Sequence, residues 1–169
     1  MLAYIFWHWT RSPASEYEAA LVGFHRELEG LQVPGLQATA SYRIQGATWA
    51  GEGLAYEDWY LVGGSADLDV LNEAAVSRPI RPAHDRPAHL AEGGAGGLYR
   101  LQSGEPDLDA AEVAWIAKPP GLAYEDFYSG LPPLRALFRR QMVLGPTPEF
   151  CAFGARDLDG RLVRRERLV

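Results

Sequence analysis

The sequence predicts an α+β fold in which one chain runs through two successive β-α-β-β passages. Two observations support this prediction. Residues 36–44 alternate between apolar and polar side chains, as a half-buried strand does, whereas residues 17–31 carry apolar side chains at the 3.6-residue period of a helix. A similar order of strand and helix patterns begins again at residue 113. With 169 residues, the chain is one ordinary domain or two small halves that share a core.

The first passage begins with residues 2–10, which are aromatic and β-rich with little alternation, so we expect a strand covered on both faces. The helix that follows starts near Ser12 and ends at Gly30. The alternating strand comes next. After it, the pattern predicts a third strand at residues 55–62 and a short helix at residues 66–77.

A further strand, either residues 98–102 or residues 113–118, completes the first passage. The elements predicted for the second passage are, in order, a strand at 113–118, a helix at 122–142 that Pro132 and Pro133 interrupt, a strand at 150–156, a turn at 157–160 and a strand at 161–169. Charged and apolar side chains interleave in this last strand, which favours a solvated sheet edge. We place the two repeats at residues 1–102 and 103–169, with a Pro- and Gly-rich connection at 78–97 inside the first.

An eight-residue sequence occurs twice. Residues 53–60 read Gly-Leu-Ala-Tyr-Glu-Asp-Trp-Tyr, and residues 121–128 differ from them only by Phe127 in place of Trp59. Such a repeat points to duplicated structure, but the flanking sequences of the two copies disagree. The first copy runs into a turn, whereas the second is followed by apolar residues at helical spacing. We therefore expect a strand in the first copy and a helix in the second, because tertiary context overrides local propensity in short segments.

The order β-α-β-β-α followed by a strand is that of a ferredoxin-like unit. In element order, over most of its length, the chain resembles the dimeric α+β barrel superfamily, whose members include antibiotic-biosynthesis monooxygenase-like, EthD-like and muconolactone isomerase-like proteins. The resemblance implies a tandem ferredoxin-like repeat that forms a dimeric-type α+β barrel within one chain. It also implies a pocket for a small apolar or aromatic metabolite and cofactor-independent isomerase, lyase or monooxygenase chemistry. The chain carries no motif of these families, so no catalytic residue is transferred.

Alternation along the strands assigns each side chain to the helix-covered face or to the cavity of such a barrel. We expect the following side chains to meet the helices: Ile5, Trp7, Trp9, Leu36, Ala38, Ala40, Tyr42, Trp59 and Leu61. We expect the opposite faces to line the cavity, with Tyr4, Phe6, His8, Thr39, Ser41, Arg43, Tyr56, Asp58 and Tyr60. An apolar pocket with a few convergent polar groups is typical of a small-molecule site.

His8 and Asp58 are the candidate catalytic residues. The first and third strands are neighbours in ferredoxin-like order, so the two side chains share a sheet face, and a carboxylate neighbour tunes a buried histidine for acid–base work. His8 is the candidate base, and the candidate substrate-binding residues are Arg43, Tyr60, Tyr4 and His84. A structural interpretation is also open: Asp58 pairs with Arg43 across the strands, and His8 is a core histidine. The protein is then a non-catalytic binding or stress-response module whose core is packed.

The connection at residues 78–97 carries His84 and His89. Their spacing does not place both on one helix face and no third ligand lies nearby, so we predict no metal site. A lid in which His84 contacts substrate and a plain surface connection both remain open. Some two-repeat members of the superfamily bind haem, but every histidine here precedes the second passage, so the usual axial ligand is missing. We predict no cofactor.

Composition narrows the class of partner. The net charge of −6 argues against general affinity for nucleic acid or anionic membranes, so we predict neither as a partner. Residues 93–97 are glycine-rich but lack the spacing of a dinucleotide-binding loop, and Ser65 lacks the glycine that a nucleophile elbow needs where Asp67 stands. Cys151 is the single cysteine, which excludes an intramolecular disulfide and suits a reducing cytoplasm. The aromatic content favours a homodimer.

Overall fold

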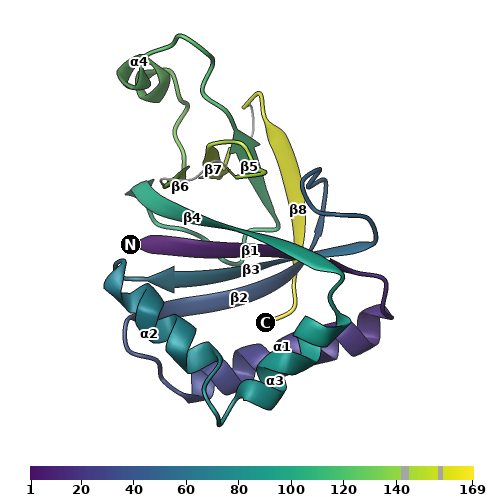
Figure 1. Ribbon diagram of the computed structural model, residues 1–169. Helices are drawn as coiled ribbons and strands as arrows, with labels where there is room; N and C mark the ends of the chain where they lie inside the picture. Colours follow the sequence, from purple (N-terminus) through teal and green to yellow (C-terminus); the bar gives the residue numbers. More distant parts are fainter. Residues whose placement is uncertain (142–144, 156–157) are drawn as a thin grey trace.

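A closed antiparallel barrel organises the molecule (Figure 1). The computed structural model describes residues 1–141, 145–155 and 158–169. Within them, the strands follow one another around the barrel in the order β1-β3-β2-β8-β5-β7-β6-β4, and β4 pairs with β1 to close the ring. The predicted α+β barrel within one chain is therefore confirmed.

The elements come in the following order along the chain: β1 (Leu2–Thr10), α1 (Ala14–Gly30), β2 (Leu36–Gln45), β3 (Leu54–Val62), α2 (Ala66–Ala75), α3 (Arg81–Leu90), β4 (Gly93–Gly104), β5 (Glu112–Ile116), α4 (Tyr124–Ser129), β6 (Ala136–Arg140), β7 (Phe150–Phe153) and β8 (Arg161–Arg167). Around the ring, the strands form two runs, β4-β1-β3-β2 and β8-β5-β7-β6. In each run, the first strand lies between the third and the fourth. The β2–β8 and β4–β6 pairs join the runs.

The helices are distributed unevenly over the barrel. Figure 1 shows α1, α2 and α3 together on the outer side of the first run of strands, and α4 at the opposite end of the molecule. α1 buries Tyr17, Leu21, Phe24 and Leu28, an apolar stripe at helical spacing, and packs against α3 and β2. Across the described residues, no helix is long and apolar enough to cross a membrane.

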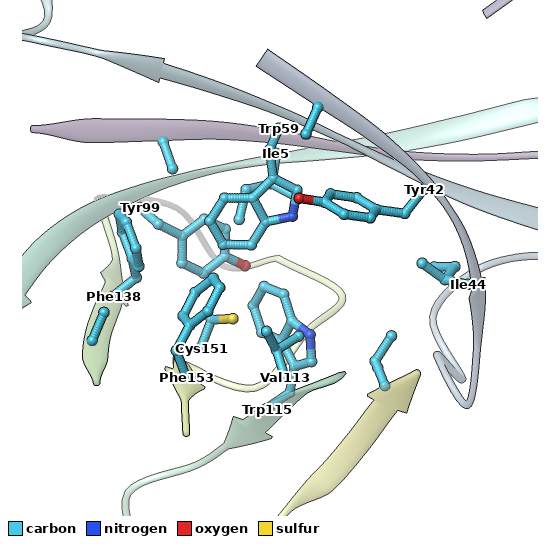
Figure 2. Close-up of a cluster of buried hydrophobic side chains, with 14 of the residues drawn as sticks. Ile5, Tyr42, Ile44, Trp59, Tyr99, Val113, Trp115, Phe138, Cys151 and Phe153 are labelled. Atoms are coloured by element: carbon cyan, nitrogen blue, oxygen red, sulfur yellow. The ribbon is translucent and has the colours of Figure 1, made fainter. Parts of the chain in front are cut away.

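Side chains fill the barrel interior (Figure 2). The indoles of Trp7, Trp59 and Trp115 are completely buried there, and the rings of Trp7 and Trp115 meet edge to face with their centroids 5.4 Å apart. Such edge-to-face pairs contribute about 1 kcal/mol beyond the area that they bury. A barrel of this size is just wide enough for side chains to fill it, so its interior is a core rather than a channel.

One buried charge pair lies within this aromatic core. The carboxylate of Glu57 accepts hydrogen bonds from the indole N–H groups of Trp7 and Trp59, each at 2.7 Å, and Arg165 Nη1 lies 3.8 Å from it. Arg165 also stacks over the Tyr42 ring at 4.3 Å. Burial raises the pKa of Glu57, and Arg165 and the indoles offset that effect only in part. These partners explain how a carboxylate is tolerated at this position.

The structure confirms the predicted faces of β1 and β3 and of most of β2, but it reverses the compartment predicted for most of these side chains. Leu36 is an exception and packs on the helix side, because an irregularity between Leu36 and Ala38 breaks the alternation of β2. Ile5, Trp7 and Trp59 point into the barrel interior, not toward the helices. His8 and Asp58 line the side that the helices cover. Alternation with period two fixes which residues share a face, but it does not say which compartment that face meets. The closed interior is the drier compartment, so it takes the bulkiest apolar side chains.

Two predictions for the second passage are wrong. The helix predicted at 122–142 ends at Ser129, and β6 (Ala136–Arg140) places Phe138 in the barrel interior instead. Prolines at 132 and 133 separate the two elements, because proline cannot continue the helix. The last strand is not a sheet edge, since β8 pairs with both β2 and β5. Residue 142 of the predicted helix, residue 156 of the strand predicted at 150–156 and residue 157 of the predicted turn lie outside the described residues.

The two copies of the octamer adopt different structures, as predicted. The first copy lies in β3, where Trp59 faces the barrel interior. In the second copy, residues 124–128 are helical in α4, and the Phe127 ring packs 4.7 Å from that of Phe150. The copies also occupy different places in their runs, because β3 is a third strand whereas α4 follows a first strand. The octamer therefore does not mark equivalent positions of two repeats.

Candidate active site between the sheet and the helices

A pocket of about 790 Å³ lies between the outer face of the first run of strands and helices α1, α2 and α3. Its floor is formed by alternate residues of β1 and β3: Tyr4, Phe6, His8, Asp58 and Tyr60. Apolar side chains of the three helices form most of its walls, among them Leu21, Phe24, Leu71 and Pro87. The pocket therefore combines an apolar enclosure with a few polar groups at its base, as small-molecule sites do.

The strand register brings the two predicted catalytic residues together. In the β1–β3 pair, Phe6 lies opposite Asp58, so His8, two residues farther along β1, is a diagonal neighbour of Asp58 on the same face. His8 Nε2 lies 3.2 Å from Asp58 Oδ2. Both side chains are almost completely buried, with exposed fractions of 1% for His8 and 3% for Asp58. The predicted proximity is confirmed, and the catalytic role remains a prediction.

A second histidine, His25 of α1, lies beside the other carboxylate oxygen of Asp58. His25 Nε2 lies 3.4 Å from Asp58 Oδ1, and its Nδ1 lies 2.6 Å from Thr39 Oγ1. The His25 ring stacks on Tyr60 with the centroids 5.4 Å apart. Both histidine contacts to Asp58 are at ion-pair distance, but neither meets the direction that a hydrogen bond requires. The two imidazoles therefore approach the carboxyl group closely without directed hydrogen bonds.

The two histidines favour the ionised form of Asp58. Burial by itself would raise the pKa of Asp58, because a buried carboxylate loses its hydration. The attraction of His8 and His25 outweighs that effect and holds the pKa of Asp58 well below its usual range. The Asp58 carboxyl group thus lies at the pocket floor between two imidazoles.

The ring of His8 is enclosed on its faces and at its nitrogens. It stacks with Phe6 at 5.3 Å between centroids and with Tyr56 at 5.7 Å. Nδ1 of His8 lies 2.7 Å from the hydroxyl of Tyr17, which also lines the pocket. Burial, followed by the charge of Asp58, raises the pKa of Tyr17, so this hydroxyl is neutral at ordinary pH.

Tyr4 and Tyr60, predicted to contact substrate, both line the pocket. The Tyr60 hydroxyl donates to Asp58 Oδ2 over 3.4 Å, and the Tyr4 and Tyr60 rings lie 6.0 Å apart. Burial, and then the charge of Asp58, raise the pKa of Tyr60 well above its usual value. Tyr60 is therefore a neutral donor to the carboxylate.

His84 also lines the pocket, but from a helix rather than from an irregular connection. Residues 81–90 form α3, with Pro82 in its first turn, where the missing N–H costs little. The His84 ring meets Phe24 edge to face at 5.6 Å, and its Nδ1 lies 3.0 Å from Asp85 Oδ1. A contact between His84 and a bound molecule stays a prediction.

Arg43 is not part of the pocket. Its guanidinium lies 3.4 Å from Glu18 and 3.1 Å from Glu166, and it is absent from the described lining. The predicted ion pair between Arg43 and Asp58 is wrong, since the histidines occupy both oxygens of the carboxylate. Arg43 shares the helix-side face of the sheet, but α1 presents Glu18 to it before it can reach the pocket.

Sequence reasoning missed His25 and Tyr17, both from α1. Tyr17 falls within the apolar pattern of residues 17–31, and no sequence pattern gives His25 a role. Their functional surroundings depend on how α1 packs across β2 and β3, which no local pattern specifies. One feature of the sequence could have indicated them. His25 and Tyr17 are polar residues on the otherwise apolar face of the helix, and a buried carboxylate on the strands beneath that face needs polar partners.

The electrostatics of the lining are one-sided. Among the described residues that line the pocket there is no Lys or Arg, whereas the exposed side chains of Asp69 and Glu92 add carboxylates. In the described part of the chain, no three or more His, Cys, Asp or Glu side chains are grouped so that they could hold a metal ion.

Comparison with known proteins assigns no family. No family model matches the sequence, and no curated protein matches it. A solved structure described as "Crystal structure study of anthrone oxidase-like protein" is similar at 9% sequence identity and a TM-score of 0.45, over 97% of this chain and 72% of that one. A likeness at this level carries no argument about function, so the functional argument rests on the geometry of the site.

Proposed function

We propose that the protein binds a small, uncharged, largely aromatic molecule in the pocket and moves a proton on it by general acid–base chemistry, without a cofactor. The observation that carries this proposal is the carboxyl group of Asp58, buried between His8 and His25 at the floor of a pocket of about 790 Å³.

The proposed chemistry follows from these charges. A base in the pocket takes a proton from a carbon next to a carbonyl group or from a ring hydroxyl, and the proton comes to rest on His8. The imidazolium that forms is 3.2 Å from the Asp58 carboxylate, and attraction at this distance is strong where water is excluded. Positioned acid–base groups accelerate such steps by about 10²–10⁴-fold. Isomerase, lyase and cofactor-independent monooxygenase reactions can all begin in this way.

The lining supports an uncharged ligand. With no Lys or Arg among the described lining residues, and with the exposed carboxylates of Asp69 and Glu92 among them, a carboxylate or phosphate would be desolvated without a cationic partner. The exposed parts of Tyr4 and Phe6 offer flat aromatic surface instead. These features favour a planar aromatic molecule whose polar atoms are a carbonyl or a hydroxyl.

A non-catalytic binding module is the second candidate, and one observation favours it. His8 is only 1% exposed, and both of its nitrogens already have neighbours within the protein. In this case the histidines stabilise a buried carboxylate and the pocket holds a molecule without changing it.

For the fold, we propose that the chain is a tandem of two ferredoxin-like units. The support is the strand order, since β4-β1-β3-β2 and β8-β5-β7-β6 each place the first strand of the run between its third and fourth strands. On this proposal, α4 and the segments around it stand where the first unit has α1. The division into residues 1–102 and 103–169 stays a prediction.

The test uses two matched aromatic probes and one reactive probe. We expect neutral 2-naphthol to bind and the carboxylate 2-naphthoate to bind at least about tenfold more weakly, a difference of about 1.4 kcal/mol, measured by titration calorimetry. Ala88→Trp, which adds bulk to a residue lining the pocket, should abolish naphthol binding, whereas His89→Trp, next to it on α3, should not.

The reactive probe is 2-tetralone labelled with tritium at its acidic C1 position. We expect the protein to speed release of the label into water by at least about 100-fold over buffer, and His8→Ala to abolish the effect. If naphthol binds but tritium release is not accelerated, the protein is the non-catalytic binding module and the catalytic part of the proposal is wrong. If neither 2-naphthol nor 2-tetralone binds, the whole proposal is overturned.

A further inference from the structure

We infer that the hydroxyl of Tyr17, rather than the imidazole of His8, is the group that exchanges a proton with the bound molecule, and that His8 and Asp58 act through it. This inference rests on the proposed function and assigns a different residue to the reacting position.

The surroundings of His8 leave it no nitrogen for a ligand. Nε2 is 3.2 Å from the Asp58 carboxylate, and Nδ1 is 2.7 Å from the Tyr17 hydroxyl. The ring stacks with Phe6 and Tyr56, so its faces are packed as well. A molecule that reached either nitrogen would first have to displace a neighbour that the fold holds in place.

Tyr17 has unused hydrogen-bonding capacity. A phenol hydroxyl can donate one hydrogen bond and accept two. Within the described residues, the Tyr17 hydroxyl makes one hydrogen bond, to His8 Nδ1, and Tyr17 is part of the pocket lining. The ring is held against Tyr56 with the centroids 4.9 Å apart, so the hydroxyl is fixed in position beside the pocket.

The protonation state of His8 sets what the hydroxyl offers to the pocket. When His8 is neutral and its proton is on Nε2, facing Asp58, the hydroxyl donates to Nδ1 and presents lone pairs to a ligand. When His8 carries a second proton, Nδ1–H donates to the hydroxyl, whose own proton is then free to point at a ligand. The same oxygen thus acts as an acceptor before proton transfer and as a donor after it.

The transfer is balanced. The C–H or O–H bond of the ligand breaks as a new O–H bond forms at Tyr17, and in the same step the original O–H bond of Tyr17 breaks as an N–H bond forms at His8 Nδ1. The ligand keeps the electron pair, His8 becomes an imidazolium beside Asp58, and the reverse transfer restores both groups. Tyr17 is neutral before and after the step, which suits the raised pKa that burial gives it.

Other titratable groups around Tyr17 have separate partners. The Tyr56 hydroxyl, from β3, donates to Glu18 over 3.1 Å, and Tyr60 donates to Asp58. His25 faces Asp58 and Thr39 rather than Tyr17. Tyr17 and His8 therefore form a connected route from the pocket to the carboxylate, in addition to the direct contact of Tyr60 with Asp58.

The test compares Tyr17→Phe with Tyr56→Phe. Both changes remove one hydroxyl from a ring that contacts His8, but the hydroxyl of Tyr56 bonds to Glu18. With tritium-labelled 2-tetralone as the probe, we expect Tyr17→Phe to lower the release rate by about 100-fold. The 2-naphthol dissociation constant should rise by no more than about tenfold, which corresponds to the loss of one hydrogen bond. Tyr56→Phe should keep the wild-type rate within about threefold.

A solvent isotope effect separates a relay from a structural role. In the relay, the Tyr17 proton, which exchanges with solvent, moves in the same step as the tritium, so release by the wild-type protein should be slower in D₂O than in H₂O. Direct transfer to His8 moves no solvent-derived proton, so equal rates in the two solvents would overturn the inference. It is also overturned if Tyr17→Phe releases tritium at the wild-type rate while His8→Ala does not, a result that leaves the proposed function standing. If the wild-type protein itself does not accelerate release, the proposed function fails and the relay with it.

Discussion

At the scale of single residues, Asp58 shows how the fold makes a buried charge tolerable. Its side chain is placed by β3 under a pocket, where an isolated carboxylate would be strongly disfavoured. His8 from β1 and His25 from α1 each lie beside one of its oxygens, and Tyr60 donates to it as well. Removing one member of such a buried group leaves the others uncompensated and typically costs about 3–5 kcal/mol.

The lowered pKa of Asp58 predicts how stability depends on acid. Because the pKa is lower in the folded state than in the unfolded chain, where it is about 3.9, the contribution of Asp58 is present above that value and is lost as the pH falls below it. In urea denaturation, we expect Asp58→Asn to lower the free energy of unfolding by about 3 kcal/mol at pH 7. The deficit should shrink as the pH falls from about 4 toward about 2. Asp69→Asn, at an exposed carboxylate of the pocket lining, is the matched control and should show no such change. A deficit for Asp58→Asn that is constant over this range would contradict the account.

Sequence reasoning reached His8 and Asp58 because strand alternation and neighbouring strands are local or near-local information. It did not reach His25 or Tyr17, since their roles depend on which face of α1 crosses which strands. Arg43 was wrongly included because a side chain on the correct face can still be held outside the pocket by a helix residue, in this case Glu18.

At the scale of elements, the repeated octamer shows that surrounding structure can decide the secondary structure of nearly identical sequences. The two copies differ at one position and fold as a strand in β3 and as a helix in α4. In the first copy, pairing with β1 and β2 satisfies the backbone on both sides. In the second, prolines at 119 and 120 precede the segment, and the Tyr124 hydroxyl donates to Glu149 over 2.8 Å. The sequences that flank the two copies were therefore enough to predict that the first copy is a strand and the second a helix.

Exchanging the two differing residues tests this explanation. The double variant Trp59→Phe with Phe127→Trp gives each site the octamer of the other. We expect residues 54–62 to remain a strand and residues 124–129 to remain helical, as measured by backbone NMR chemical shifts. The free energy of unfolding should fall by about 1–3 kcal/mol, because Glu57 loses the indole donor of Trp59. If the secondary structure changes at either site, the identity of residue 59 or 127, and not its surroundings, determines whether the octamer is a strand or a helix.

At the scale of the whole molecule, the barrel and the pocket divide the aromatic side chains between them. Sequence patterns predicted an α+β barrel and the faces of β1, β3 and most of β2, but they placed the pocket inside the barrel. The structure fills that interior and opens the pocket under the helices instead. Two compartments that both accept aromatic residues cannot be told apart by hydrophobicity alone, because the difference lies in closure of the sheet by long-range strand pairing. The predicted homodimer and the predicted cytoplasmic location stay predictions.

The most direct test of the central claim is a crystal structure of the protein with 2-naphthol. The account predicts that the naphthalene ring lies between the β1 floor at Tyr4 and Phe6 and the wall formed by α2, with its hydroxyl within hydrogen-bonding distance of Tyr17. Naphthol bound inside the barrel, on the outer side of α4, or in the pocket with its hydroxyl turned away from Tyr17 and His8 would contradict the claim that this pocket is the functional site.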